Sequence, residues 1–154
     1  MAKYKVRQAE YPDHASRQKI IEAATHELRL VYKPVNKVVP NPKLSIGILV
    51  VADGDILIGT AEYINNEDNM YIQGIAVHQD YRKKGVCRML IEEIRELAIK
   101  QNYEQLSLCV IEETGNVSVF EKIGFNVINK YQSNHYIGLE GQIVTQVEMV
   151  KIIA

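Results

Sequence analysis

The stretch MYIQGIAVHQDYRKKGVCRMLIEEIRELAIK, residues 70–100, is the segment that decides the fold. Its apolar first part, Met70–Val77, predicts a strand covered on both faces, and its last part predicts an amphipathic helix from residue 86 to about 101. The first turn of a helix presents unpaired backbone N–H groups and the positive end of the helix dipole. Three cations and a glycine precede this helix: Arg82, Lys83, Lys84 and Gly85. The sequence therefore predicts a site for a phosphorylated ligand.

The residues around this turn exclude two common phosphate-binding motifs. The sequence has no GxxxxGK[ST] pattern, which excludes a Walker loop, and no GxGxxG pattern after a strand, which excludes the dinucleotide fingerprint. Backbone amides of residues 83–87 are expected to point toward a common anion. A single glycine among basic residues favours a diphosphate bound from the side.

The rest of the chain predicts one α/β domain over residues 1–154, with a mixed sheet of six or seven strands. Strands are expected at Tyr4–Gln8, 45–52, 56–64, Met70–Val77, Gln105–Ile111, 126–131 and 142–153, and helices at 15 to about 30, 86 to about 101 and 116–123. Prolines make residues 32–43 a loop. Residues 70–111 form a β-α-β unit, which is expected to be right-handed.

Composition narrows the class of protein and its compartment. Eighteen basic and 19 acidic residues leave a formal charge of −1, so no global charge favours nucleic acid or an acidic membrane surface. The N-terminus lacks the apolar core of a signal peptide, and no apolar run is long enough to span a bilayer. The two cysteines, Cys87 and Cys109, and four histidines have no metal-ligand spacing. We therefore expect a cytoplasmic protein without a metal.

Three ordered segments resemble the GNAT superfamily of N-acetyltransferases. Arg82-x-x-Gly85-x-Cys87, preceded by IAV and followed by a helix, resembles the acetyl-CoA signature Q/R-x-x-G-x-G/A of that family. VFEKIGF, residues 119–125, is similar to the family's LYEKxGF, and VEMVKII fits the family's C-terminal strand. The resemblance covers about residues 45–153. It implies a GNAT-like sheet whose parallel strands splay apart in the centre.

The resemblance also implies a function, the transfer of an acetyl group from acetyl-CoA to a primary amine by direct attack in a ternary complex. The amine belongs to a small molecule or a peptide. The thioester is expected in the notch between Met70–Val77 and Gln105–Ile111, with the pantetheine arm along the first of these strands and the pyrophosphate on the basic turn. The cofactor-binding residues implied are Ile75, Ala76, Val77, Arg82, Lys83, Lys84, Gly85, Val86, Cys87, Arg88, Glu113, Phe120 and Lys122.

Three positions depart from the family's usual catalytic residues. Phe120 occupies the position of the tyrosine that protonates the CoA thiolate in many members, and it has no proton to give. Tyr71 stands where some members carry a glutamate base, with Gln73 next on the same face, and Glu113 stands where an asparagine often contacts the cofactor arm. Tyr71, Gln73 and Glu113 are therefore the candidate catalytic residues. Tyr131 and Tyr136, near the last hairpin, are alternative acids.

Several alternatives stay open at this point. Cys87, at a helix start beside Lys84 and Arg88, is either a thiol with a lowered pKa or a small side chain that fits where glycine or alanine usually sits. The protein is either an enzyme or a CoA-binding module with little catalysis because of Phe120. An unrelated nucleotide-phosphate binder is a weaker third interpretation. Residues 15–41 and 133–142 are expected to build the acceptor groove, and a homodimer is possible.

Overall fold

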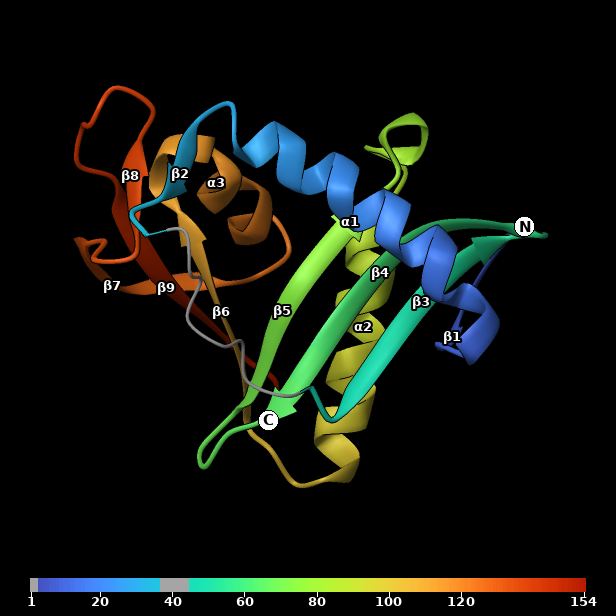
Figure 1. The fold of residues 1–154 in the computed structure, drawn as a ribbon. Helices are drawn as coiled ribbons and strands as arrows, with labels where there is room; N and C mark the ends of the chain where they lie inside the picture. Colours follow the sequence, from blue (N-terminus) through green and yellow to red (C-terminus); the bar gives the residue numbers. More distant parts are fainter. Residues whose placement is uncertain (1–2, 37–44) are drawn as a thin grey trace.

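The computed structural model describes residues 3–36 and 45–154. Seven strands form one sheet in the order β1-β3-β4-β5-β6-β9-β7, and β2 and β8 form a separate two-stranded sheet (Figure 1). The strands are β1 (Tyr4–Gln8), β2 (Tyr32–Pro34), β3 (Gly47–Asp53), β4 (Ile56–Asn65), β5 (Met70–Val77), β6 (Gln105–Ile111), β7 (Asn126–Gln132), β8 (Tyr136–Gly138) and β9 (Thr145–Ile152). The helices are α1 (His14–Leu28), α2 (Val86–Lys100) and α3 (Asn116–Glu121). The predicted α/β class with a mixed sheet is confirmed.

The centre of the sheet holds its parallel pair, β5 and β6, joined through α2. These two strands pair at Met70 with Leu106 and at Tyr71 with Ser107, which are the first residues of β5 and the second and third of β6. Beyond these pairs the strands diverge toward their carboxyl ends (Figure 1). The splayed β-α-β unit that the sequence predicts is therefore present, with both strand ranges as predicted.

A bulge in β5 redirects the strand where it leaves β6. The register between β4 and β5 shifts between Thr60 and Glu62, opposite Gly74. Gly74 has φ +61°, a left-handed conformation that side chains with a Cβ adopt only with strain. A Cβ at this position would also lie 3.2 Å from Oε2 of Glu62. Glycine therefore permits both the bulge and the close approach of the Glu62 carboxylate.

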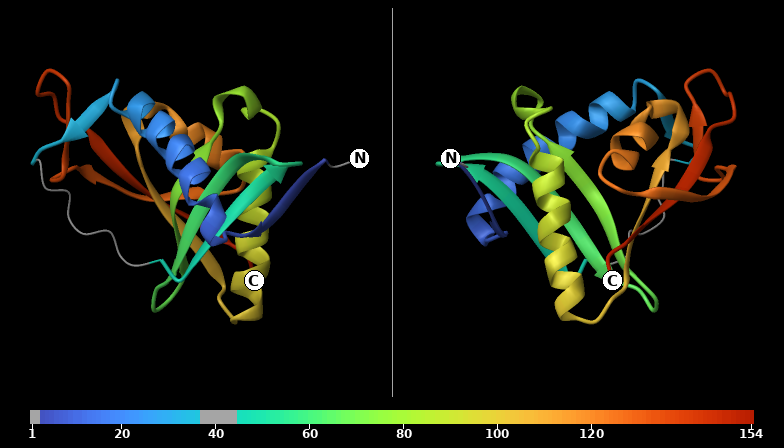
Figure 2. Two further views of the ribbon diagram at one scale, coloured as in Figure 1. Left: turned by 45° about the vertical axis from the view of Figure 1, so that its right-hand side comes forward. Right: turned by 180° about the vertical axis from the view of Figure 1, so that it is seen from behind.

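Helices α1 and α2 cover opposite faces of β3, β4 and β5 (Figures 1 and 2). The apolar stripe of α2 is buried against the sheet, and its members are Val86, Leu90, Ile91, Ile94 and Ala98. Coverage on both faces explains why β5 reads as an apolar run rather than an alternating one. The largest side chain at the centre of the core is Phe125, which is 1% exposed.

Three expectations from the sequence need correction. Residues 32–34 are not loop, because Tyr32–Pro34 pairs with β8 (Tyr136–Gly138), a strand that the sequence did not predict. The last strand starts at Thr145 rather than 142, because the N–H of Gly138 donates to the carbonyl of Gln142 at 2.8 Å and closes a loop there. The third helix ends at Glu121 rather than 123. The remainder of the predicted loop, residues 37–43, lies outside the described residues.

Helix length and polarity bear on membrane insertion. Among the residues that the structure describes, no helix is long and apolar enough to cross a membrane.

Candidate active site

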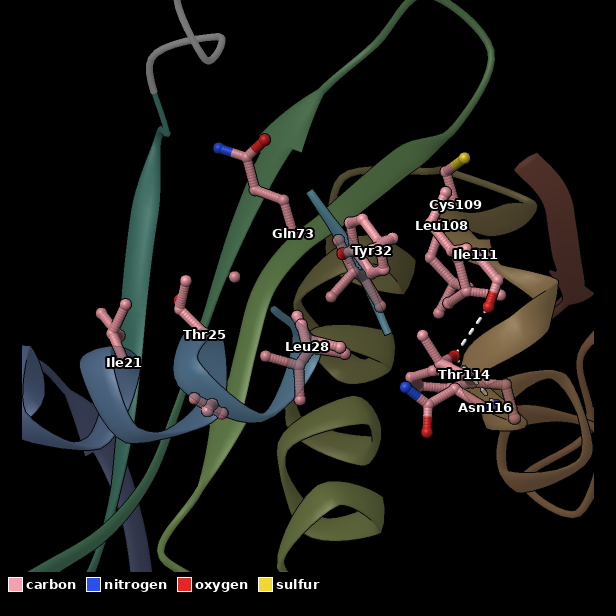
Figure 3. A pocket seen from close by; sticks show the side chains of 17 residues that line it. Ile21, Thr25, Leu28, Tyr32, Gln73, Leu108, Cys109, Ile111, Thr114 and Asn116 are labelled. Atoms are coloured by element: carbon pink, nitrogen blue, oxygen red, sulfur yellow. Dashed lines mark hydrogen bonds between the residues drawn. The ribbon is translucent and has the colours of Figure 1, made fainter. Parts of the chain in front are cut away.

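A cavity of about 240 Å³ lies where β5 and β6 diverge, under the C-terminal half of α1. Ile21, Thr25 and Leu28 of α1 close one side, and residues 72–76 of β5 and 108–111 of β6 form the walls (Figure 3). Most of this lining is apolar, as expected for a site that binds an uncharged arm. The cavity lies in the notch where the sequence predicts the thioester. We call it the inter-strand cavity.

The β6-facing edge of β5 supplies backbone groups along this cavity. On its other edge β5 pairs with β4, through Ala76 with Thr60 and Val77 with Gly59. On the edge that faces β6, only Met70 and Tyr71 of β5 pair with β6 among the described residues. Ile75 and Ala76 line the cavity, whereas Val77 is not part of its lining. An extended ligand therefore finds a strand edge with which it can pair.

The basic turn after β5 has the conformation of an anion-binding helix start. Gly85 is the N-cap of α2 with φ +83°, and Lys83 also has a positive φ, of +60°. The first N–H groups of a helix have no partner within it, and here the first bonded amide is that of Met89, which donates to the carbonyl of Gly85 at 2.9 Å. No atom lies within 4 Å of a Cβ added at Gly85. The turn is therefore open to a ligand.

Two of the three cations of this turn contact other side chains. Arg82 donates to both oxygens of Glu27 on α1, at 2.8 and 2.6 Å, and both side chains are exposed. The ammonium of Lys84 lies 5.3 Å from the centre of the Tyr81 ring. Lys83 is exposed. A ligand phosphate thus meets one guanidinium that is shared with α1 and two exposed ammonium groups.

The VFEKIGF segment packs beside the cavity. Phe120, on α3, is 8% exposed and lines the cavity, and its ring meets that of Phe125 edge to face at 6.0 Å. The C-cap residue of α3, Lys122, accepts a hydrogen bond on its backbone oxygen from Arg88 of α2 at 3.1 Å. Phe120 is thus a wall of the cavity, and the segment ties α3 to the start of α2.

The sequence that forms this site matches the model of a known protein family. The sequence model of the acetyltransferase (GNAT) family matches residues 8–125, which include the basic turn, both splayed strands and Phe120. The chain belongs to the GNAT acetyltransferase family. It is therefore an enzyme of the acyltransferase class, in a family whose members use acetyl-CoA as the acetyl donor.

Solved acetyltransferases share the fold over nearly the whole chain. The ribosomal-protein-S18-alanine N-acetyltransferase from Escherichia coli matches with a TM-score of 0.72 and 16% identity, covering 98% of this chain and 94% of that one. An N-acetyltransferase from Staphylococcus aureus Mu50 matches with a TM-score of 0.75 and 13% identity, covering 99% of this chain and 100% of that one. The protein yncA from Salmonella typhimurium, solved with its cofactor acetyl-CoA, matches with a TM-score of 0.70 and 11% sequence identity. The match covers 99% of this chain and 95% of that one. A comparison with curated protein sequences finds no match.

Within this GNAT domain, the thiol of Cys87 is not activated, because its pKa is raised rather than lowered. It is half-buried at the start of α2, and burial raises the pKa of its thiol to about 11, although the charge of Arg88 acts to lower it. Desolvation thus outweighs the attraction of the thiolate to Arg88. The structure supports the interpretation of Cys87 as a small side chain that fits the turn.

We expect alkylation of Cys87 to be slow at neutral pH. With a pKa of about 11, about one thiol in a thousand is ionised at pH 8, and only the thiolate reacts. The rate measured with iodoacetamide by peptide mass spectrometry should rise about tenfold per pH unit up to about pH 10. A rate at Cys87 that levels off near pH 8 would contradict the burial argument.

The three candidate catalytic residues lie in different places. Gln73 lines the inter-strand cavity, and its amide donates to Oγ of Ser45 at 3.1 Å. Tyr71 lines a second, larger hollow, and burial raises the pKa of its hydroxyl to about 12. Glu113 is exposed, and its carboxylate accepts the N–H of Thr145 at 2.7 Å. Glu113 is in the lining of neither hollow.

A polar network behind Gln73 was not anticipated from the sequence. Arg17 of α1 donates to Thr60 at 2.9 Å and to Glu62 at 3.2 Å, and Ser45 donates to the second oxygen of Glu62 at 2.5 Å. Through Ser45 the network reaches Gln73. It connects α1 to β4 and orients the Gln73 amide, which is one of two amide side chains in the cavity wall, the other being that of Asn116. No sequence motif predicts these contacts, because the residues that hydrogen-bond to one another are 17 to 45 positions apart in the chain.

Tyr32 is a further residue of the site that the sequence did not predict. It is buried in β2 and lines the inter-strand cavity (Figure 3). It also lines the larger hollow. Burial raises the pKa of its hydroxyl, and the nearby guanidinium of Arg29, 5.0 Å from the ring centre, opposes that rise. Tyr131 and Tyr136 line only the larger hollow. Tyr32 is therefore the tyrosine that lies between the inter-strand cavity and the larger hollow.

Metal ligands do not gather here. In residues 3–36 and 45–154, no three His, Cys, Asp or Glu side chains come together in a way that could hold a metal ion.

Proposed function

We propose that this protein transfers the acetyl group of acetyl-CoA to a primary amine by direct attack in a ternary complex. The observation that supports the proposal most is the continuity of the site. The open edge of β5 leads from the inter-strand cavity to the Gly85 turn, so one extended molecule can place a thioester in the first and a diphosphate at the second. Acetyl-CoA has this shape, and it is bound to the yncA structure that shares the fold.

The donor is held mainly by backbone groups. Amides of residues 83–87 and the cations beside them bind the pyrophosphate. The pantetheine arm pairs with the edge of β5 near Ile75 and Ala76, which places the thioester carbonyl beside the strand. A strand N–H near Ile75 then donates to the carbonyl oxygen and stabilises the negative charge that develops on it. The residues of the site thus supply binding and orientation before any proton moves.

The reaction forms one bond and breaks one. The neutral amine nitrogen attacks the acetyl carbon, the carbon–sulfur bond breaks with its electron pair on sulfur, and the amine nitrogen loses one proton while the CoA thiolate gains one. Tyr71 is a poor base for this step, because with a pKa of about 12 it stays protonated. Gln73 has no titratable group. The protonated Tyr71 does not line the inter-strand cavity, so the proton donor to sulfur must be sought on the wall of that cavity.

We assign the donor role to Tyr32. Its hydroxyl is protonated at neutral pH, since burial raises its pKa, and it belongs to the cavity lining that also contains Phe120. The hydroxyl of Thr114, also on this wall, is already committed, because it donates to the carbonyl of Ile111 at 2.6 Å. Tyr32 then takes the part that the tyrosine of the LYEKxGF segment plays in related enzymes.

We expect Tyr32→Phe to lower kcat about tenfold or more, with a smaller change in the KM for acetyl-CoA, because a positioned acid contributes at least that much. Adding Phe120→Tyr to this variant returns a phenol to the cavity wall and should recover most of the loss. Release of CoA thiol across a panel of primary amines measures both effects. Equal kcat for the wild type and Tyr32→Phe would remove Tyr32 from the mechanism.

The same assay, with a calorimetric titration of acetyl-CoA beside it, separates catalysis from binding alone. If acetyl-CoA binds but no amine is consumed at any pH, the chain is a CoA-binding member of its family and the proposed function fails. The cytoplasmic location and a homodimer stay predictions.

A further inference from the structure

The larger hollow, of about 920 Å³, opens beside the inter-strand cavity and shares Tyr32, Leu108 and residues 109–111 with it. It follows β6, with β9 on one side and the start of β5 on the other. Because the two spaces meet at Cys109, a molecule in the larger hollow has one end beside the thioester. Its volume suits a small organic ligand. We call it the acceptor groove. Of the segments expected to build such a groove, residues 15–41 contribute Tyr32 and residues 133–142 contribute His135 and Tyr136, and most of the lining comes from β6 and β9 instead.

Apart from the imidazole of His135, the charged side chains that line the acceptor groove are carboxylates. Glu148 of β9 and Asp68 of the β4–β5 turn line it, and no lysine or arginine does so among the described residues. Glu148 lies directly opposite Cys109 in the β6–β9 register, so it is at the end of the groove next to the cavity. The chain as a whole is nearly neutral, with a formal charge of −1. The acidic character is thus a local property of the groove.

Tyrosines surround the Glu148 end. Tyr71 and Tyr131 line the groove, and the carboxylate of Glu148 is close enough to both hydroxyls to influence their ionisation. Gln146, next to Glu148 on the same face, donates to Tyr131 and to the sulfur of Cys109, each at 3.4 Å. Phenol rings attract cations to their faces, and a carboxylate beside them strengthens this preference. This end of the groove is therefore built for an ammonium group.

The distance along β6 between the two ends of the groove limits the length of the ligand. Asn69, next to Asp68, accepts a hydrogen bond from Ser107 at 2.5 Å, which fixes that end of the groove at the level of Ser107. Cys109 and Glu148 lie two residues farther along β6, which corresponds to about 7 Å. A linear aliphatic diamine or triamine reaches from one level to the other. A molecule with a carboxylate would meet repulsion at either end.

We propose that the acceptor is a linear aliphatic polyamine, with an ammonium group bound by Glu148, Tyr71 and Tyr131 and a more distant one near Asp68. This inference rests on the proposed acetyl transfer and names its substrate class. The amine at the Glu148 end gives its ammonium proton to solvent water and attacks the acetyl carbon beside Cys109. The new nitrogen–carbon bond forms as the carbon–sulfur bond breaks, the electron pair leaves with the CoA sulfur, and the nitrogen loses a second proton while the thiolate gains one. The remaining ammonium groups keep the chain of the polyamine in place.

Calorimetric titration with the linear triamine spermidine, in the presence of CoA so that no transfer occurs, tests the proposal. Wild type should bind spermidine, and Glu148→Gln should bind it about tenfold more weakly or worse, because a hydrogen-bonded charge is lost. Asp68→Asn, at an exposed position, should weaken binding by about threefold. Glu93→Gln makes the same change on the exposed side of α2, away from both hollows, and should bind as wild type does.

Two outcomes overturn the substrate class. One is equal spermidine affinity in wild type, Glu148→Gln and Asp68→Asn. The other is a preference, in the same titration, for an amino acid or a lysine-containing peptide over spermidine. The proposed function is judged separately, by thiol release from acetyl-CoA. Spermidine binding that depends on Glu148 without any transfer would refute the function alone, whereas transfer to other amines without spermidine binding would refute the polyamine alone.

Discussion

Replacing Gly85 by valine is expected to raise the dissociation constant of acetyl-CoA by about thirtyfold or more, which is about 2 kcal/mol. Gly85 has φ +83°, and a residue with a Cβ costs about 1–2 kcal/mol in this conformation. Because nothing in the free protein lies within 4 Å of the added Cβ, the side chain would enter the space that the pyrophosphate needs. Any relaxation of the turn would also misalign its amides. Affinity should therefore fall by more than stability does.

Gly141→Val is the matched control for that experiment. Gly141 has φ +85°, and a Cβ there also meets no atom within 4 Å, but it lies in the loop after β8 rather than at the start of α2. Both variants should lose similar stability in thermal unfolding, and only Gly85→Val should lose affinity in calorimetric titration with acetyl-CoA. Equal affinity of Gly85→Val and the wild type would refute the pyrophosphate placement.

Replacing Phe125 by alanine is expected to lower the free energy of unfolding by about 3–5 kcal/mol. Its ring is 1% exposed at the end of the VFEKIGF segment and supports Phe120 from the side, with the ring centres 6.0 Å apart. Removal leaves a cavity that a rigid sheet and two helices can only partly close. Urea unfolding followed by circular dichroism measures the loss.

Phe125→Leu separates volume from aromatic character. It keeps most of the buried volume, so we expect a loss of about 1–1.5 kcal/mol. A loss below about 1 kcal/mol for the alanine variant would mean that the site collapses around the missing ring, contrary to the packing seen here.

The central fold was predictable because its signals are local. The strand at Met70–Val77, the strand at Gln105–Ile111 and the start of α2 at Val86 agree residue for residue with the structure, since each is bounded by turn residues. The bulge at Gly74 was not foreseen. A glycine within an apolar strand shows a bulge only when its partner strand and the nearby Glu62 are known.

The walls of the site were less predictable, because they depend on contacts between distant segments. Tyr32 lies in a proline-rich stretch, and only its pairing with β8, about a hundred residues later, makes it a buried strand residue. The alternation of Gln146 and Glu148 with Val147 and Met149 indicates one polar face, but the register with β6 decides that this face lies beside Cys109. The sequence also suggested a lowered pKa for Cys87 as one alternative, because burial is not visible in it.

The crystal structure of the protein grown with acetyl-CoA tests the central claim most directly. We expect electron density for the pyrophosphate against the amides of residues 83–87 and for the thioester between β5 and β6, beside Tyr32 and Phe120. Density for acetyl-CoA at any other surface, with the inter-strand cavity and the Gly85 turn both empty, would contradict this account.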